Sequence, residues 1–317
     1  MPIPFQPERL SGVHAATVCP FTAQGAIDEV GLAHHIAAVA SRPGINGLLL
    51  NGHAGEGPFL TTSEKSAVIR VAQQAAPGTF ICAGVTSEAT AAAVLEAEAA
   101  QKAGADALLV FPPAHFALGH DTEMAVAHHR AIAAVGAPLL LYRAPIRAGH
   151  LAYGVETLSA LAAIDAVVGV KEGSWEVAAY EEVRRTLKAI RPELAVLASG
   201  DEHLMTGFLI GSEGSQVSLA AVIPDTIVAL FEAAQSGDWV RARWLHDVLY
   251  PLSAAIYRAA PAYRATARLK TALLMMDAIA SDSVRLPMQS TPAHERTALS
   301  AALNHAGVTT IGAPLPA

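Results

Sequence analysis

The chain has 317 residues, of which 52% are hydrophobic and 15% charged, and its formal net charge is −7 at pH 7. This composition excludes a disordered protein, and the acidic balance argues against a surface for nucleic acids or anionic membranes. The apolar runs are shorter than the roughly 18–20 residues of a spanning helix, and the N-terminus lacks the pattern of a signal peptide. We therefore expect a cytoplasmic protein that does not enter a membrane.

Short runs of leucine and β-branched residues recur along the chain and predict eight β-strands. The predicted strands end near Cys19, Asn51, Gly84, Phe111, Tyr142, Lys171, Ser199 and Ser218. Segments with helical periodicity lie between them at 28–41, 63–75, 87–103, 121–135, 175–190 and 202–210. Most strand ends are about 30 residues apart, which is the length of one strand, one helix and two loops.

The alternation of strands and helices predicts an α/β protein, and eight such units favour a closed (β/α)₈ TIM barrel over residues 1–223. No strand pattern returns after residue 223, so residues 224–317 are predicted to form a helical C-terminal extension packed on the barrel. Capping residues and glycines support the helix ends. The predicted N-caps are Ser63, Ser87 and Asp121, and the predicted C-terminal stops are Gly104, Gly136 and Gly211.

Lys171 follows an apolar strand in the segment VVGVKEGS. Active sites of TIM barrels gather at the carboxyl ends of the strands, so this lysine is predicted at the barrel mouth. If strand alternation turns Gly169 and Lys171 inward, burial disfavours the ammonium form, lowers the pKa of the amine and frees it as a nucleophile. The residues alone leave open a surface or salt-bridged lysine.

Tyr142 ends the strand that precedes the strand of Lys171. Its hydroxyl could pass a proton to or from a carbinolamine formed at Lys171, whereas the alternative is a tyrosine that only caps the core. The turn NGHAGEG at 51–57 holds three glycines that let backbone amides approach a carboxylate. An ordinary strand–helix connection is the alternative for this turn, which matches neither a Walker loop nor the dinucleotide fingerprint.

Thirteen histidines raise the question of a metal. Because the sequence has no HExxH motif and no Cys/His cluster with ligand spacing, we predict no metal site. The pairs His34-His35 and His128-His129 fall on predicted helices and are interpreted as surface or interface residues. The segment SGDE at 199–202 is interpreted as a helix N-cap rather than a metal or sugar contact.

In their order along the chain, several segments resemble the dihydrodipicolinate synthase / N-acetylneuraminate lyase family of class I (Schiff-base) aldolases. The similar segments are ATVCPF, QGAID, GHAGEGPFLT, YRAPIRAG, GVKEGS, ASGDEHL, LKTALLMM and VRLP, and the resemblance covers roughly residues 12–300. It implies that Lys171 forms an imine with pyruvate or another 2-oxo acid and that Tyr142 transfers protons. The implied enzyme is an aldolase or dehydratase that works through an enamine and needs no cofactor beyond the covalent imine.

The chain also departs from the pattern of the synthases in this family. His53 and Ala54 stand where the synthases carry two threonines, so their threonine relay cannot operate unchanged, and we expect His53 to act as an acid/base or hydroxyl-binding group. Gln216 lies where a small apolar residue is usual, whereas Arg147 matches an arginine that binds the second substrate's carboxylate in the synthases. The predicted substrate-binding residues are His53, Ala54, Gly55, Arg147, Gln216 and Ser218.

Two alternative functions stay open at this point. The first is 4-hydroxy-tetrahydrodipicolinate synthase, which condenses pyruvate with aspartate semialdehyde. Arg147 favours it, whereas His53, Ala54 and Ala114, which lies where the synthases have a tyrosine pair, oppose it. The second is a homologue that binds a 2-oxo acid without turnover, which the intact Lys171 and Tyr142 argue against. The family further implies a homo-oligomer, either a dimer or a tetramer, with a small-molecule 2-oxo acid as its partner and neither nucleic acid nor membrane.

Overall fold

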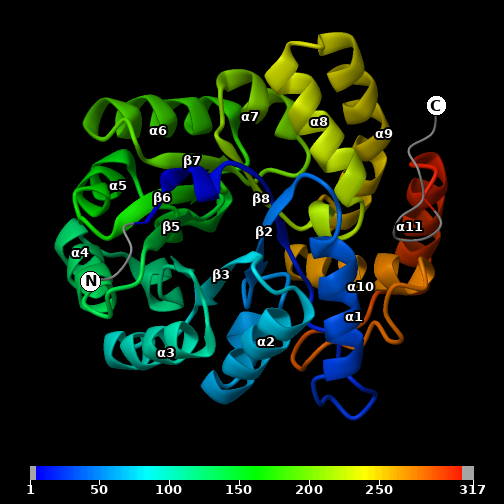
Figure 1. Ribbon diagram of the computed structural model, residues 1–317, viewed down its shortest axis with the longest axis horizontal. Coiled ribbons are helices and arrows are strands. Elements are labelled where there is room, and N and C mark those ends of the chain that lie inside the picture. The colour runs from blue at the N-terminus through cyan, green and yellow to red at the C-terminus, as the bar shows by residue number, and fades with distance from the viewer. Residues whose placement is uncertain (1–4, 309–317) are drawn as a thin grey trace.

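A computed structural model describes residues 5–308, and in it eight parallel strands close into a barrel (Figure 1). The strands are β1 (Gly12–Ala16), β2 (Ile45–Leu50), β3 (Phe80–Val85), β4 (Ala107–Val110), β5 (Leu139–Arg143), β6 (Val167–Glu172), β7 (Ala195–Ala198) and β8 (Gly214–Val217). Each strand pairs with its neighbour in sequence, and β1 pairs with β8 to close the barrel. The predicted TIM barrel is confirmed.

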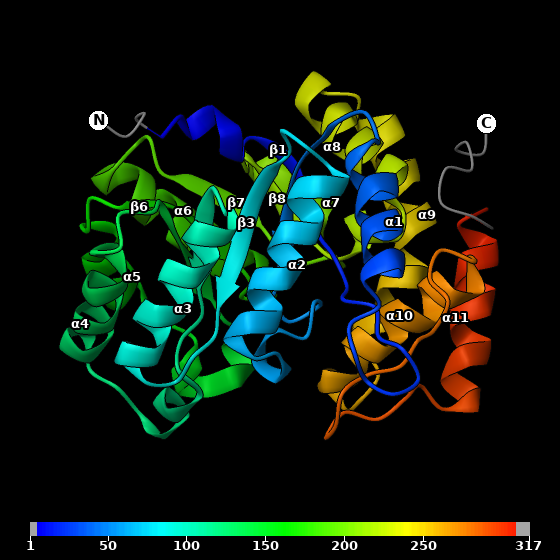
Figure 2. The same cartoon turned by 60° about the horizontal axis from the view of Figure 1, so that its bottom comes forward.

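A helix follows each strand and covers the outside of the barrel (Figure 2). These helices are α1 (Glu29–Ala40), α2 (Thr62–Ala75), α3 (Thr90–Ala103), α4 (Thr122–Ala133), α5 (Val155–Ala162), α6 (Val177–Ile190), α7 (Leu204–Ile210) and α8 (Pro224–Ser236). Short 3-10 helices are η1 (Pro7–Leu10), η2 (Gly57–Phe59), η3 (Ala114–Leu118), η4 (Ile146–Leu151), η5 (Leu219–Ala221) and η6 (Ala262–Arg264).

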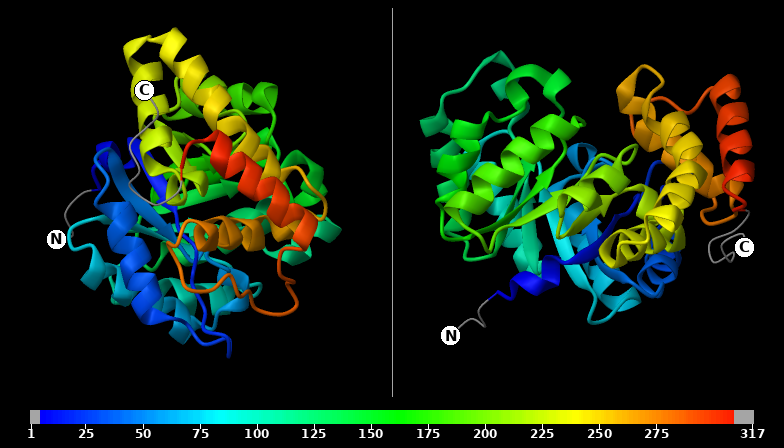
Figure 3. Two further views of the ribbon diagram at one scale, coloured as in Figure 1. Left: turned by 90° about the vertical axis from the view of Figure 1, so that its right-hand side faces the viewer. Right: turned by 90° about the horizontal axis from the view of Figure 1, so that it is seen from above.

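Three further helices follow the eighth unit and gather on one side of the barrel (Figure 3). They are α9 (Trp239–Tyr257), α10 (Ala265–Met275) and α11 (Ala293–His305). The helix α9 packs against α8 and α11, and α10 packs against α9 and α11. The expected division of the chain into residues 1–223 and 224–317 stays a prediction.

The strands bury side chains on both faces, which explains their continuous apolar runs. Leu49, Leu109 and Leu197 fill the barrel interior, whereas Leu48 and Leu108 point the opposite way, into the layer between strands and helices. Strand alternation therefore decides which side chains reach the interior. Within residues 5–308, no helix combines the length and apolar character needed to cross a membrane.

The observed helix ends agree in part with the capping residues and glycine stops predicted from the sequence. Asp121 caps α4 by accepting a hydrogen bond from the backbone N–H of Met124, as predicted. Gly104 and Gly211 end α3 and α7 in left-handed conformations, also as predicted. Gly136 is left-handed too, two residues beyond the C-cap of α4.

Two predicted serine caps are wrong. The N-cap of α2 is Thr61 rather than Ser63, because Thr61 and Glu64 form a capping box two residues earlier. The hydroxyl of Ser87 donates instead to the buried carboxylate of Glu96, and α3 begins only at Thr90.

The interpretation of the paired histidines as surface residues is wrong for three of the four. His35, His128 and His129 are buried, whereas His34 is exposed. Burial lowers the pKa of His35 and of His129 to about 4, so both are neutral core residues at pH 7. Adjacent histidines on one helix point to different sides, and small alanine side chains spread around α1 and α4 blur the periodicity that would show which side meets the barrel.

Candidate active site

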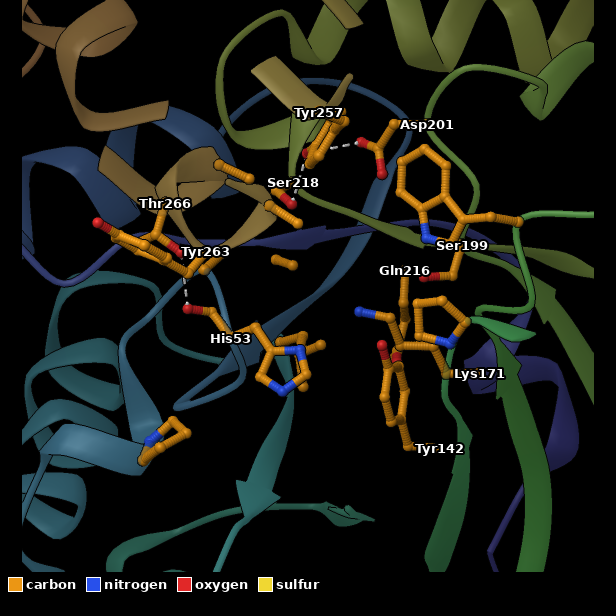
Figure 4. A pocket seen from close by; sticks show the side chains of 18 of the residues that line it. His53, Tyr142, Lys171, Ser199, Asp201, Gln216, Ser218, Tyr257, Tyr263 and Thr266 are labelled. Carbon is orange, nitrogen blue, oxygen red and sulfur yellow. Dashed lines mark hydrogen bonds between the residues drawn. The ribbon is translucent and has the colours of Figure 1, made fainter. Parts of the chain in front are cut away.

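A cavity of about 710 Å³ opens at the carboxyl ends of the strands (Figure 4). Its strand residues, which lie at the inner end, are Ala16, Leu49, Tyr142, Lys171 and Gln216. Loops and C-terminal helices supply the remaining lining, which includes His53, Ala54, Phe59, Arg147, Trp175, Ser199, Asp201, Ser218, Tyr257, Tyr263 and Thr266. The position agrees with the usual place of active sites in this fold.

Lys171 points into this cavity from β6, at a position that pairs with Tyr142 on β5. Its Nζ lies 5.9 Å from the centre of the Tyr142 ring. Burial lowers the pKa of the Lys171 amine to about 8, although the negative charge of Asp201 partly opposes this shift. A useful fraction of the amine is therefore neutral near pH 7, which is the form that attacks carbonyl carbon.

The Tyr142 side chain is 6% exposed, and burial together with the nearby Glu172 raises the pKa of its hydroxyl. The phenol is therefore protonated at pH 7, which suits it to donate and return a proton. Alternation along β6 turns Glu172 outward, away from the cavity. There its carboxylate pairs with Arg143 Nη1 at 3.0 Å and accepts a hydrogen bond from Ser174, which joins β5 to β6 behind the site.

The turn at 51–57 keeps an unusual shape. Asn51 and Glu56 have φ values of 57° and 58°, in the left-handed region. Gly55 fits closely behind the turn, because a Cβ there would lie 3.1 Å from the Asn51 nitrogen and 3.3 Å from the Thr17 carbonyl oxygen. Gly55 consequently does not line the cavity, whereas its neighbour Ala54 does.

The C-terminal helices hold this turn in place. Thr266 of α10 donates a hydrogen bond to the His53 carbonyl at 3.1 Å. The buried carboxylate of Glu56 accepts hydrogen bonds from Lys270, also on α10, and from the backbone N–H of Arg285 at 2.9 Å. The chain beyond the barrel thus fixes the loop after β2 from behind.

His53 lies open to the cavity, with its ring 4.7 Å from the ring of Phe111 and 5.5 Å from that of Tyr142. Desolvation by the cavity wall and the positive charge of Lys171 lower the pKa of His53, so its imidazole is neutral at pH 7. A neutral imidazole both donates and accepts hydrogen bonds. Figure 4 shows it across the cavity from Lys171 and Tyr142.

A second polar group borders the cavity at Tyr257. Its hydroxyl lies 3.2 Å from Asp201 Oδ1 and 2.9 Å from Ser218 Oγ (Figure 4). Because a phenol has one proton and the carboxylate only accepts, Tyr257 donates to Asp201 and accepts from Ser218. Asp201 also accepts from the Leu219 N–H, and burial raises the pKa of its carboxyl to about 6. Asp201 therefore does not cap α7, whose N-cap position is His203.

The remaining predicted residues also reach the cavity. The guanidinium of Arg147 lies 5.9 Å from the centre of the Trp175 ring. Gln216 is fully buried, and neither polar atom of its amide has a hydrogen-bond partner among residues 5–308. The structure thus brings together every predicted site residue except Gly55, which stands behind the turn.

Sequence reasoning missed several cavity residues, namely Trp175, Tyr257, Tyr263 and Thr266. Three of these belong to the C-terminal segment, where no strand end marks the positions that face the barrel. Across the described part of the chain, no group of three or more His, Cys, Asp or Glu side chains could hold a metal ion.

A TIM barrel with a half-buried lysine amine near the end of β6 and a tyrosine at the paired position of β5 defines a lyase of the class I aldolase type. The chain belongs to the Dihydrodipicolinate synthetase family, whose profile matches residues 9–306. The resemblance recognised in the sequence is confirmed.

Similar proteins cover nearly the whole chain. An uncharacterized DapA-like lyase of Halobacterium salinarum is 34% identical over 304 residues, covering 95% of this chain and 96% of the relative. 4-Hydroxy-tetrahydrodipicolinate synthase 1 of Streptomyces coelicolor is 33% identical over 289 residues, covering 90% and 91%. Among solved structures, the 4-hydroxy-tetrahydrodipicolinate synthase of Methylacidiphilum fumariolicum SolV is similar with a TM-score of 0.85 at 26% identity, covering 94% and 96%.

Proposed function

We propose that the protein is a Schiff-base-forming lyase for pyruvate or another 2-oxo acid, with Lys171 as the nucleophile and Tyr142 as the proton-transfer group. The observation that carries this proposal is the half-buried amine of Lys171, whose pKa is lowered to about 8 and which faces the cavity next to a protonated phenol. Lys171 forms no ion pair at 4 Å or less with another residue among 5–308.

The chemistry follows from the protonation states. The neutral amine attacks the ketone carbon, and the developing alkoxide takes a proton to give a carbinolamine. Loss of water leaves a protonated imine, which draws electrons from C3. Removal of a proton from C3 gives an enamine, from which a hydroxide on C4, protonated as it leaves, departs as water and a conjugated iminium remains. In aldol cleavage a hydroxyl on C4 loses its proton instead, the C3–C4 bond breaks, an aldehyde is released and the electron pair of that bond forms the enamine. Tyr142 is the group placed to move protons to and from the oxygen of the carbinolamine.

The turn after β2 is the candidate site for the substrate carboxylate. Backbone amides near Ala54 and Gly55 lie in a fixed turn beside the cavity, and fixed amide donors suit an anion. His53, being neutral and opposite Tyr142, replaces the hydroxyl group expected in synthases at this position. Arg147, at the outer part of the cavity, supplies a cation for a distal acidic group.

A second candidate function is 4-hydroxy-tetrahydrodipicolinate synthase. It is favoured by Arg147 in the cavity and by the 33% identity to the Streptomyces coelicolor synthase. His53 and Ala54 oppose it, because they remove both hydroxyl groups from the expected relay. A coupled assay with pyruvate and aspartate semialdehyde separates the two functions, since condensation should be negligible if the first proposal holds.

The proposed reaction uses the covalent imine in place of a cofactor. We further assign the protein to the cytoplasm and to a homo-oligomer, either a dimer or a tetramer, on the basis of the family. Light scattering on the purified protein tests the assembly, and cell fractionation tests the location.

Trapping the imine tests the central proposal directly. The protein is incubated with pyruvate and borohydride, which reduces an imine to a stable amine, and the intact mass and the modified peptide are determined. We expect one 1-carboxyethyl group, the reduced pyruvate adduct, at Lys171 and none in a Lys171→Ala variant. Lys65, a buried lysine paired with Glu96 at 2.6 Å, provides an internal control that should stay unmodified. An unmodified Lys171 would contradict the proposed Schiff-base function.

A further inference from the structure

Gln216, at the inner end of the cavity, has a buried side-chain amide without hydrogen-bond partners among the described residues. It is fully buried on β8, and both its amide oxygen and its amide nitrogen lack a hydrogen-bond partner among the described residues. Buried amides are nearly always hydrogen-bonded. An amide that loses its hydrogen bonds to water on burial and gains none in the protein destabilises the fold. The Cys82 thiol nearby is a weak hydrogen-bonding group that does not replace this loss.

The surroundings of Gln216 point to a ligand as its missing partner. Two other strand residues at the inner end of the cavity, Ala16 and Leu49, have apolar side chains. Figure 4 shows the Gln216 side chain in the cavity, on the same side as Lys171 and Tyr142. The Cys82 thiol lies near both Gln216 and Lys171, so the Gln216 amide is on the side of the cavity where the imine carbon forms (Figure 4).

The chemistry of the amide restricts the group that it binds. Nε2 donates two hydrogen bonds and Oε1 accepts, so complete pairing requires a substrate with both an acceptor and a donor. Pyruvate held as an imine offers the acceptor oxygens of its carboxylate and a methyl group, which leaves Oε1 unpaired. A hydroxyl on C3 supplies the missing donor.

Building on the proposed Schiff-base function, we infer that Gln216 is a specificity-determining residue that selects 2-oxo acids with a hydroxyl on C3. A site built to bind a hydroxyl disfavours an analogue with a methyl in its place, because its buried polar atoms then stay unpaired. A competing role for Oε1 is to accept from the iminium nitrogen or the carbinolamine hydroxyl of every substrate. The two roles predict different effects of removing the amide.

A matched pair of substrates tests the inference. 3-Hydroxypyruvate and 2-oxobutyrate have the same number of non-hydrogen atoms and differ by a hydroxyl or a methyl on C3. Borohydride trapping, followed by intact mass, gives the concentration at which half of the protein is modified by each. For the unaltered protein we expect this concentration to be about 10-fold or more lower for 3-hydroxypyruvate.

The Gln216→Leu variant keeps the approximate size of the side chain and removes its polar atoms. We expect it to abolish or reverse the preference while pyruvate is still trapped. A control variant, Gln101→Leu, makes the same change at an exposed position of α3 and should keep the preference. Circular dichroism verifies that both variants are folded.

The remaining outcomes separate this inference from the proposed function. Failure of the unaltered protein to trap pyruvate overturns the Schiff-base function itself. If pyruvate is trapped but the two matched substrates behave alike, the selection of a C3 hydroxyl is wrong. If Gln216→Leu weakens trapping of all three acids to the same extent, the amide serves the imine rather than the substituent, and the inference is again overturned.

Discussion

The hydroxyl of Tyr257, on α9 beyond the barrel, lies 3.2 Å from the carboxylate of Asp201, on the loop after β7. Asp201 in turn raises the pKa of Lys171, against the larger effect of burial. A helix outside the eight barrel units therefore contacts the carboxylate that raises the pKa of the reactive amine. The ionisation of this cluster gives the first two predictions.

Imine formation should depend on pH through Lys171. Only the neutral amine attacks, and its pKa is about 8, so the rate of pyruvate trapping should rise about tenfold per pH unit below this value and level off above it. The measurement is the initial rate of borohydride-trapped adduct at fixed pyruvate from pH 6 to 10. A midpoint near 10.5, the ordinary lysine value, would contradict the assignment of a buried nucleophile.

The Asp201→Asn substitution should move this profile to lower pH. Above its own pKa of about 6 the carboxylate is negative and favours the ammonium form of Lys171, so its removal lowers the pKa of the amine. We expect a shift of up to about one pH unit and faster trapping at pH 7. The control is Glu202→Gln, which removes the same charge from the next residue, where the carboxylate pairs with Arg258. Equal shifts in both variants would refute a specific effect of Asp201.

Replacement of Tyr142 by phenylalanine should slow imine formation without preventing it. The ring stays in its packed position, but the hydroxyl that moves protons at the carbinolamine oxygen is lost, so formation of the imine, and of the enamine derived from it, should slow by about 10²–10⁴-fold. Exchange of the pyruvate methyl protons for deuterium, followed by NMR, measures this step without a known natural substrate. Borohydride trapping of the imine at long incubation should persist.

Tyr180→Phe is the matched control for Tyr142→Phe. Its hydroxyl is also buried but donates to the Val196 carbonyl at 3.1 Å, behind the barrel wall. Loss of this hydrogen bond should lower stability while leaving the exchange rate near that of the unaltered protein. If deuterium exchange in Tyr142→Phe stays within a factor of a few of the unaltered rate, another group moves the proton.

The sequence predicted the barrel because its strands are continuous apolar runs, and the errors at their ends are small. The first strand ends at Ala16 rather than near Cys19, since backbone pairing stops before the apolar run does. The helix α5 was absent from the predicted helices. It has only 8 residues and begins at Val155, after Gly154, an N-cap residue without a side chain.

Prediction of the site succeeded for residues that follow strand ends and failed for residues that reach it from elsewhere. Lys171 and Tyr142 occupy paired strand positions, so chain order alone places them together. Tyr257 meets Asp201 across 56 residues of sequence, and its contact depends on how α9 packs on the barrel. Nothing in the local sequence of Asp201 distinguishes a carboxylate bound by a distant phenol from a helix cap.

Removal of the Lys171 amine should stabilise the fold. Its pKa is about 8 in the folded protein and near 10.5 when unfolded, so between these values the unfolded chain binds more protons and stability rises with pH. At pH 7 the folded protein carries the full cost of burying the charged form, and Lys171→Met should raise the free energy of unfolding by about 1–3 kcal/mol. The gain should shrink as the pH approaches 10.

Urea unfolding at pH 7 and pH 10 measures this effect. Lys102→Met makes the same substitution at an exposed position of α3 and should change stability by less than about 0.5 kcal/mol at either pH. A Lys171→Met variant that is less stable than the unaltered protein at pH 7 would show that the lysine is well solvated or paired.

The buried ion pair between Glu56 and Lys270 should couple the turn after β2 to α10. Both side chains are 0% exposed, and burial raises the pKa of Glu56 and lowers that of Lys270, so each needs the other to stay charged. Lys270→Met alone leaves a buried carboxylate without its partner and should cost about 3–5 kcal/mol in urea unfolding. Glu56→Gln with Lys270→Met removes both charges and should recover at least 1 kcal/mol of that loss. If the double variant instead loses as much unfolding free energy as the two single variants together, the two charges do not depend on each other. The hydrogen bond from Thr266 to the His53 carbonyl would then be the main contact that holds the turn to α10.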